Sequence, residues 1–323
     1  MFDDWTHQAR CDLHALRGRA GAWGYKKGAT PSVEPSVLSS LGLIASRREG
    51  SAGHDLAIAR NAAEWLATIQ RGDGSLPVCE GALTPAWTTP YALLLWSGIP
   101  GFETSRNDAR KSLLRLKGRT VPRGQASAKL FGHDSTVVGW PWVEGTHSWV
   151  EPTALAILAL CREGMADHPR VEAGVQLILD RSLEGGGWNY GNKSVFGRGL
   201  RPQPGPTALA LLALFAHQDD SPECGRAIDY LRRELRDVRS GISLGWGVLG
   251  LRAWGAAPRE SDAWLGESYR RYGARPDAVV SLALLLLAAS ETALDLLVKR
   301  GENKAARVAL PDRSPPNLTR TCS

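Results

Sequence analysis

Residues 139–160 read GWPWVEGTHSWVEPTALAILAL, and this stretch holds the two features that decide the fold. A turn rich in tryptophan comes first, and a Glu-Pro-Thr step then opens a run that is almost wholly apolar. Proline is well tolerated in the first turn of a helix, because the N–H group that it lacks would have no partner there. The stretch therefore predicts an aromatic turn and, from about Pro152, a helix that is buried on every side.

The pattern recurs along the chain. Each copy has a turn, then a proline, then an apolar run. The copies occupy residues 22–45, 89–96, 139–160 and 187–215, and two further apolar runs span 245–254 and 277–289. The prolines that open the runs, Pro35, Pro90, Pro152 and Pro206, are 55, 62 and 54 residues apart. A spacing this regular indicates one helical unit repeated along the chain.

Amphipathic segments separate the apolar runs. In two of them one helical face is apolar, formed by Ile58, Ala62, Trp65 and Ile69 and by Ile228, Leu231, Leu235 and Val238. Buried helices that alternate with amphipathic ones predict an all-α fold, an α/α toroid of about six helical hairpins in two concentric rings. We expect a single domain over residues 1–298, of which about the first 15 residues are an N-terminal extension.

The charge of the chain is unevenly distributed. The formal net charge is +6, and residues 299–323 contain six basic and two acidic side chains, so the body is nearly neutral. A protein that binds nucleic acid carries a basic patch on its folded part, and we therefore expect no nucleic-acid partner. The polar composition of residues 299–323 predicts a basic, disordered C-terminal tail.

Composition and cysteine usage predict a soluble cytoplasmic protein. Hydrophobic residues make up 43% of the chain and charged residues 22%, as in ordinary globular proteins. The five cysteines are scattered without a CxxC pair, which is typical of free thiols in a reducing compartment. The N-terminus lacks an export signal, and the longest apolar run, residues 282–289, is far shorter than the roughly 20 residues of a membrane span. Peripheral contact with a membrane stays open.

Short motifs resemble those of a known superfamily. The strings AEWL at residues 63–66 and DGSL at 73–76, with Gln70 between them, resemble the QW motif of squalene and oxidosqualene cyclases. SLEGGGW at residues 182–188 resembles a second copy with serine in the glutamine position. The aromatic turn and proline-led apolar helix are similar to the repeat that these cyclases share with protein prenyltransferase β subunits. The resemblance covers most of the chain and implies a toroid that handles an isoprenoid in an aromatic-lined central cavity by acid-initiated chemistry.

The catalytic motifs of that superfamily are altered here. The Asp-x-Asp-Asp acid of squalene–hopene cyclases and the Asp-Cys-Thr-Ala of oxidosqualene cyclases do not occur in the sequence. The nearest string is HDST at residues 133–136, and Asp277 opens an apolar run with a single carboxylate. The Asp-x-Cys zinc motif of the prenyltransferases is also missing. His147 and Glu151 are four residues apart, but Pro152 at the helix start leaves His147 outside the helix. We therefore predict no metal and no cofactor.

Asp134 is the first candidate for a catalytic acid. It follows His133, which can orient its proton, and it lies just upstream of the aromatic turn. Glu34 and Glu151 each stand at the start of an apolar helix, and we expect them near the same mouth of the toroid. Because a helix N-terminus favours the ionised form of a carboxyl group, Glu151 fits better as a charge stabiliser than as the first proton donor. All three carboxylates are open to a simpler interpretation as helix caps or turn residues.

Aromatic side chains in the turns are candidates for the lining of a cavity. Their faces stabilise cations, which suits carbocation chemistry, although packing between helices is an alternative role. The predicted substrate-binding residues are these turn aromatics and two polar residues near them, Glu34 and His147. The aromatic residues are Trp23, Tyr25, Trp140, Trp142, Trp149, Trp188 and Tyr190.

Three functions remain open on the sequence alone. The first is a terpenoid-cyclase-like enzyme with a hydrophobic isoprenoid substrate. The second is a toroid that binds a lipid or serves as a scaffold without catalysis. The third is a carbohydrate-active α/α-barrel hydrolase or lyase that uses two carboxylates, such as Asp134 and Glu151, beside tryptophan platforms.

Overall fold

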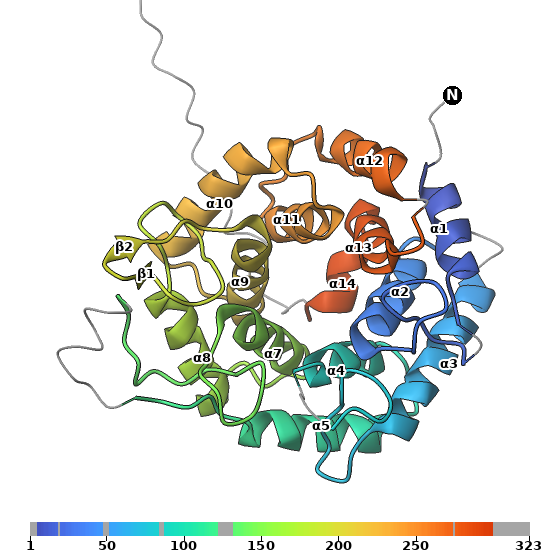
Figure 1. Ribbon diagram of the computed structural model, residues 1–323, viewed down its shortest axis with the longest axis horizontal. Coiled ribbons are helices and arrows are strands. Elements are labelled where there is room, and N and C mark those ends of the chain that lie inside the picture. Colours follow the sequence, from blue (N-terminus) through green and yellow to red (C-terminus); the bar gives the residue numbers. More distant parts are fainter. Residues whose placement is uncertain are drawn as a thin grey trace, which may run out of the picture.

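The computed structural model describes residues 5–18, 20–47, 52–83, 87–121, 132–273 and 275–299, and the structural statements below concern these residues. Twelve of their helices form two concentric rings (Figure 1). The inner ring consists of α2 (Val33–Ala45), α4 (Thr89–Ser97), α7 (Val150–Arg162), α9 (Pro204–His217), α11 (Gly241–Ala253) and α13 (Val279–Ala289). The outer ring consists of α1 (Trp5–Ala15), α3 (Ala52–Ile69), α5 (Glu103–Arg115), α8 (Pro169–Asp180), α10 (Pro222–Glu234) and α12 (Ser261–Tyr272).

The inner ring is closed. Each inner helix packs against the next, and α13 packs against α2, so that the two ends of the repeat meet (Figure 1). Outer helices cover seams between inner helices, as α8 does between α7 and α9 and α10 does between α9 and α11. The only strands in the described part are the two-residue β1 (Ser194–Val195) and β2 (Arg198–Gly199), which form a small hairpin. The predicted all-α toroid of six hairpins is confirmed.

The inner helices are buried around their whole circumference, as their apolar sequences predict. In α2 every residue except Glu34 is buried, and in α9 residues 205–214 are all buried. Glycines let the helices approach closely: a Cβ at Gly42 would lie 2.8 Å from the carbonyl oxygen of Ala283 in α13. Because the residues that face the centre are as buried as the others, side chains pack the middle of the toroid along these helices.

One end of the toroid is closed by the short helix α14 (Ala293–Leu297), which Figure 1 shows in the middle of the ring. It packs against five inner helices, α2, α4, α7, α11 and α13. The Arg162 guanidinium at the end of α7 donates to the carbonyl oxygens of Asp295 (2.7 Å) and Val298 (3.3 Å). Ser290 donates its hydroxyl hydrogen to the carbonyl oxygen of Ala45 at the end of α2 (2.7 Å).

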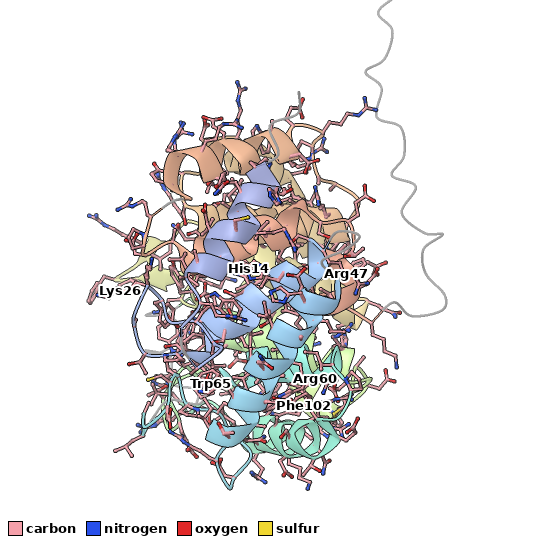
Figure 2. The ribbon with its side chains drawn as sticks, turned by 90° about the vertical axis from the view of Figure 1, so that its right-hand side faces the viewer. His14, Lys26, Arg47, Arg60, Trp65 and Phe102 are labelled. Atoms are coloured by element: carbon pink, nitrogen blue, oxygen red, sulfur yellow. The ribbon has the colours of Figure 1, made fainter. Side chains whose placement is uncertain are left out.

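The opposite end is where the inner helices begin. We call it the mouth face, and it is formed by the described parts of the connections from outer to inner helices, which lie within residues 16–32, 70–88, 116–149, 181–203, 235–240 and 273–278. Figure 2 shows the toroid from the side, with Lys26 projecting from the mouth face and Arg47 near the other face. The short 3₁₀ helix η1 (Leu235–Asp237) belongs to the mouth face.

The N-terminal segment differs from the sequence prediction. Residues 5–15 are not an extension but the outer helix α1, which packs against α12 and α13. Its Ala9 and Leu13 are fully buried, and the buried guanidinium of Arg10 donates to Asp55 of α3 at 2.6 Å. Because α1 has so few apolar positions, its sequence shows no apolar helical periodicity. The ion pair between Arg10 and Asp55 supplies part of the contact that holds α1 to the toroid. The predicted C-terminal tail, apart from Lys299, lies outside the described residues.

None of the described helices combines the length and the apolar composition needed to cross a bilayer.

Candidate functional site

Three neighbouring inner helices bring polar side chains together at the mouth face. Glu34 is the second residue of α2, Tyr91 lies in the first turn of α4, and Glu151 is the second residue of α7. Because α4 packs between α2 and α7, the starts of these helices are adjacent. Tyr25, from the turn before α2, and Tyr91 both donate hydrogen bonds to Glu34, at 2.7 Å and 3.1 Å. We call Tyr25, Glu34, Tyr91 and Glu151 the mouth cluster.

The two carboxyl groups of the mouth cluster have raised pKa values. Burial raises the pKa of Glu34, against the hydrogen bonds from the two tyrosines, which lower it. Burial and the neighbouring charge of Glu34 together raise the pKa of Glu151 to about 7. The sequence predicted an ionised Glu151 on the grounds that a helix N-terminus favours the anion. Burial and the second carboxyl outweigh that effect, so near neutral pH Glu151 is available both as an acid and as a base.

Aromatic rings adjoin the mouth cluster. The Trp87 ring meets Tyr91 edge-on at 6.0 Å between centroids and meets Trp142 edge-on at 4.8 Å. Trp87 and Trp142 are half-buried, whereas Tyr91 is 2% exposed. A run of aromatic rings thus begins at Tyr91, whose hydroxyl binds Glu34, and continues through Trp87 to Trp142 in the turn that precedes α7.

Trp87 and Tyr91 were not among the predicted site residues. The sequence holds a pattern that could have identified them, in the weakest copy of the repeat. Trp87 precedes Pro90 by three residues, as Trp149 precedes Pro152. Tyr91 is the one hydroxyl-bearing aromatic in an otherwise apolar run.

Glu151→Gln is expected to make the protein more stable than the wild type at pH 8 but not at pH 4. The carboxyl of Glu151 has its ordinary pKa of 4.5 in the unfolded chain and about 7 in the folded one. Between these values the folded state holds a proton that the unfolded state has released, so the wild type loses stability as pH rises through this window. The full cost above pH 7 is about 3 kcal/mol, at about 1.4 kcal/mol per pKa unit.

Urea denaturation at both pH values measures this difference. Glu144→Gln is the matched control, because Glu144 is exposed on the same mouth face. If Glu151→Gln changes the free energy of unfolding equally at pH 4 and pH 8, the raised pKa is refuted.

The structure places Asp134 away from the mouth cluster, at the end of outer helix α8. Its carboxylate accepts hydrogen bonds from the backbone N–H (2.9 Å) and the hydroxyl (2.6 Å) of Thr136, and its own N–H donates to Asp180 at 3.2 Å. Asp180 also pairs with Arg181 at 3.2 Å. Asp134 thus has the contacts of a turn residue, and neither it nor His133 is among the groups that shift the pKa of Glu151.

Three of the predicted cavity tryptophans, Trp23, Trp140 and Trp188, lie inside the wall of the toroid. They are at most 1% exposed. Their indole N–H groups donate to carbonyl oxygens in the last turns of α1, α5 and α8, those of Leu13, Leu113 and Ile178. Their backbone N–H groups donate to the hydroxyls that follow the helix prolines, those of Ser36, Thr153 and Thr207. Because carbonyls at a helix end lack partners within the helix, each indole joins an outer helix to the next inner one and is not placed to line a cavity.

The remaining predicted residues lie at or near the mouth. Trp149 is half-buried and packs against Gly191, where a Cβ would come within 2.9 Å of its ring. Tyr190 is 53% exposed, and its carbonyl oxygen accepts from the N–H of Val150 at 2.9 Å. His147 is exposed, with its Nδ1 atom 3.2 Å from the carbonyl oxygen of Arg119. Among the described residues no group of three or more His, Cys, Asp or Glu side chains is arranged to hold a metal ion.

Neither the known family models nor the curated proteins match this sequence. Solved structures resemble the fold of the chain. The chain is similar to the type II terpene cyclase MstE from Scytonema, bound to the product merosterolic acid A, with 15% identity over 91% of this chain and 98% of that one, and a TM-score of 0.57. It is also similar to a protein from Actinoplanes, with 17% identity over 88% and 97% of the two chains and a TM-score of 0.56.

The chain has the fold of the type II terpene cyclases. A third similar structure, ent-copalyl diphosphate synthase from Streptomyces platensis, agrees: its TM-score is 0.50 at 17% identity, over 80% of this chain and 50% of that one. Another structure of MstE holds its substrate, geranylgeranyl dihydroxybenzoate. At these identities the likeness concerns the fold alone.

Proposed function

We propose that this protein is a terpenoid-cyclase-like enzyme that acts on an isoprenoid or other hydrophobic substrate at the mouth face by acid-initiated chemistry. The observation that carries the proposal is the carboxyl of Glu151, which burial and Glu34 hold near a pKa of 7 beside a run of aromatic rings. A general acid is most effective when its pKa lies near the working pH. The fold that this chain shares with isoprenoid cyclases supports the substrate class.

The first proposed step is transfer of the Glu151 proton to one carbon of a C=C bond. The π-electron pair forms the new C–H bond, the O–H electron pair stays on the carboxylate, and the other carbon becomes cationic. A second double bond attacks this cation and closes a ring. Loss of a proton from a neighbouring carbon to the Glu151 carboxylate then ends the reaction and restores the acid. Substrate and product are isomers, and no co-reactant is consumed.

The other members of the site have distinct roles in this proposal. Glu34, fixed by hydrogen bonds from Tyr25 and Tyr91, raises the pKa of Glu151 and so favours its protonated form. The faces of Trp87 and Trp142 stabilise the cation, each by about 0.5–2 kcal/mol. The assignment gives Glu151 the role of acid in place of Asp134 and His133, and it places the substrate at the mouth, since the centre is packed.

Turnover in D₂O tests the proposal. The purified protein is incubated with a panel of linear isoprenoids and prenylated aromatic acids, and products are analysed by mass spectrometry. We expect an isomer of the substrate that carries one carbon-bound deuterium, because the acid exchanges with solvent before it protonates the alkene. If no substrate turns over and a lipid co-purifies with the protein, the protein is a non-catalytic lipid-binding toroid.

The same carboxyl pair favours a second candidate, a carbohydrate-active enzyme. One acid with a raised pKa, a second carboxyl beside it and neighbouring tryptophans are also the parts with which glycosidases cleave sugars. Release of reducing ends from a panel of oligosaccharides, with no isoprenoid turnover, would replace the first proposal with this one.

A further inference from the structure

The exposed apolar side chains of the described residues gather on one face of the toroid. Of eight large hydrophobic residues with substantial exposure, only Leu56 lies elsewhere, near the start of outer helix α3. The other seven stand in the connections of the mouth face or in the first turn of α11: Tyr25, Leu83, Val143, Tyr190, Phe196, Leu200 and Ile242. A monomer that needed no apolar contact would scatter such residues.

Phe196 and Leu83 are the most exposed of these side chains. Phe196 occupies the tip of the β1–β2 hairpin with 87% of its surface exposed. Its φ is +50°, a backbone region in which glycine and asparagine are less strained than a bulky residue. A large apolar side chain is therefore presented to solvent at a position that favours a small or polar one.

Charged residues are also distributed unequally between the mouth face and the opposite face. In the described parts of the mouth-face connections, thirteen lysines and arginines stand against seven aspartates and glutamates. In the connections of the opposite face, counted through Lys299 and including α14, three basic residues stand against seven acidic ones. Over the described residues, the mouth-face connections are thus basic as well as apolar, and the opposite-face connections are acidic.

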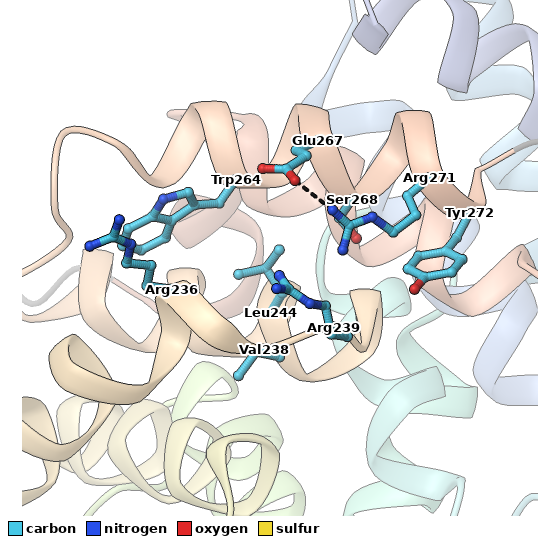
Figure 3. A pocket seen from close by; sticks show the side chains of 9 residues that line it. All are labelled: Arg236, Val238, Arg239, Leu244, Trp264, Glu267, Ser268, Arg271 and Tyr272. Atoms are coloured by element: carbon cyan, nitrogen blue, oxygen red, sulfur yellow. Dashed lines mark hydrogen bonds and ion pairs between the residues drawn. The ribbon is translucent and has the colours of Figure 1, made fainter.

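A pocket in the wall beside the mouth face is lined by three arginines. It is a shallow hollow, open to solvent, between η1 and α12 (Figure 3). Arg236 and Arg239 on one side have no ion-pair partner among the described residues, while Arg271 on the other is paired with Glu267 at 2.6 Å. Ser268, which also lines the pocket, is 9% exposed, and its hydroxyl has no hydrogen-bond partner in the described part of the chain.

We infer that the mouth face docks on a lipid surface that contains anionic headgroups. The exposed apolar side chains enter the boundary between headgroups and acyl chains, and the basic side chains neutralise the headgroup phosphates. This contact is peripheral, and it turns the mouth cluster toward the lipid. The inference goes beyond the proposed function and does not depend on it.

Flotation with lipid vesicles tests the inference without any assay of activity. We expect the protein to float with vesicles of phosphatidylcholine and phosphatidylserine, to float less at high ionic strength, and to stay in solution with phosphatidylcholine alone. Leu83→Ser combined with Phe196→Asn is expected to weaken partition about tenfold or more, and Arg236→Glu combined with Arg239→Glu to abolish its dependence on phosphatidylserine.

Matched controls lie on the other parts of the surface. Leu56→Ser removes the one exposed apolar side chain outside the mouth face, and Arg47→Glu with Arg259→Glu reverses charge on the opposite face; we expect neither to weaken partition. The inference is overturned if the wild type ignores phosphatidylserine or if Leu56→Ser weakens partition as much as the mouth-face variant. It is also overturned if light scattering shows that Leu83→Ser with Phe196→Asn splits a dimer, because the face would then bind a second copy.

Discussion

Replacement of Glu151 by glutamine is expected to lower isoprenoid turnover at least about 100-fold, since a general acid contributes about 10²–10⁴ to the rate. The amide keeps the shape of the side chain but has no proton to give to an alkene. In the wild type, turnover should fall as pH rises through about 7, because the Glu151 carboxyl, whose pKa is raised to that value, then loses the proton that starts the reaction.

Asp134→Asn is the matched control for that experiment. Asp134 was the first candidate on the sequence, and its carboxylate is engaged by Thr136 in a turn at the end of α8. We expect this variant to retain turnover and the same pH profile. A loss of about 100-fold in Asp134→Asn, with Glu151→Gln unaffected, would return the acid to Asp134 and refute the assignment.

Trp140→Ala is expected to lower the free energy of unfolding by about 3–5 kcal/mol, the usual cost of truncating a buried tryptophan. The ring is 1% exposed, its N–H donates to Leu113 at 2.8 Å, and the guanidinium of Arg170 lies 3.5 Å from the ring centroid. Truncation would empty the space between outer helices α5 and α8 and leave the Leu113 carbonyl without a partner.

Trp142→Ala, two residues away, provides the comparison. Trp142 is half-buried at the mouth and contacts Trp87, so its loss should cost less stability and should instead weaken the binding of a hydrophobic ligand. Urea denaturation of both variants separates the two roles. Equal destabilisation would mean that both rings belong to the core.

The sequence predicted those features that depend on local pattern. The proline-led apolar runs became the inner helices, because a run without a polar face can be stable only when it is buried on every side. The mouth position of Glu34 and Glu151 followed from the same reasoning. What stayed hidden depended on contacts between distant segments. Tyr91 reaches Glu34 across 57 residues, and α1 is anchored by the pair between Arg10 and Asp55, 45 residues apart.

The roles of the tryptophans show why composition alone misleads. A tryptophan in a glycine-bounded turn satisfies two descriptions equally well, that of a cavity wall and that of a structural joint. For Trp23 and Trp188 the decision rests on the partner of the indole N–H, a carbonyl at the end of the preceding outer helix. No local pattern reveals that partner, because it depends on how the outer helix is placed against the turn.

Closure of the ring by α13 against α2 bears on how the chain is made. The first inner helix receives its second neighbour only after residues 279–289 have left the ribosome, and the bond from Ser290 to Ala45 spans 245 residues. Until then α2 keeps an apolar flank open to water, and such a flank makes an incomplete chain prone to aggregate. Because the inner ring is closed, a circular permutant opened at another hairpin would retain every contact between neighbouring inner helices.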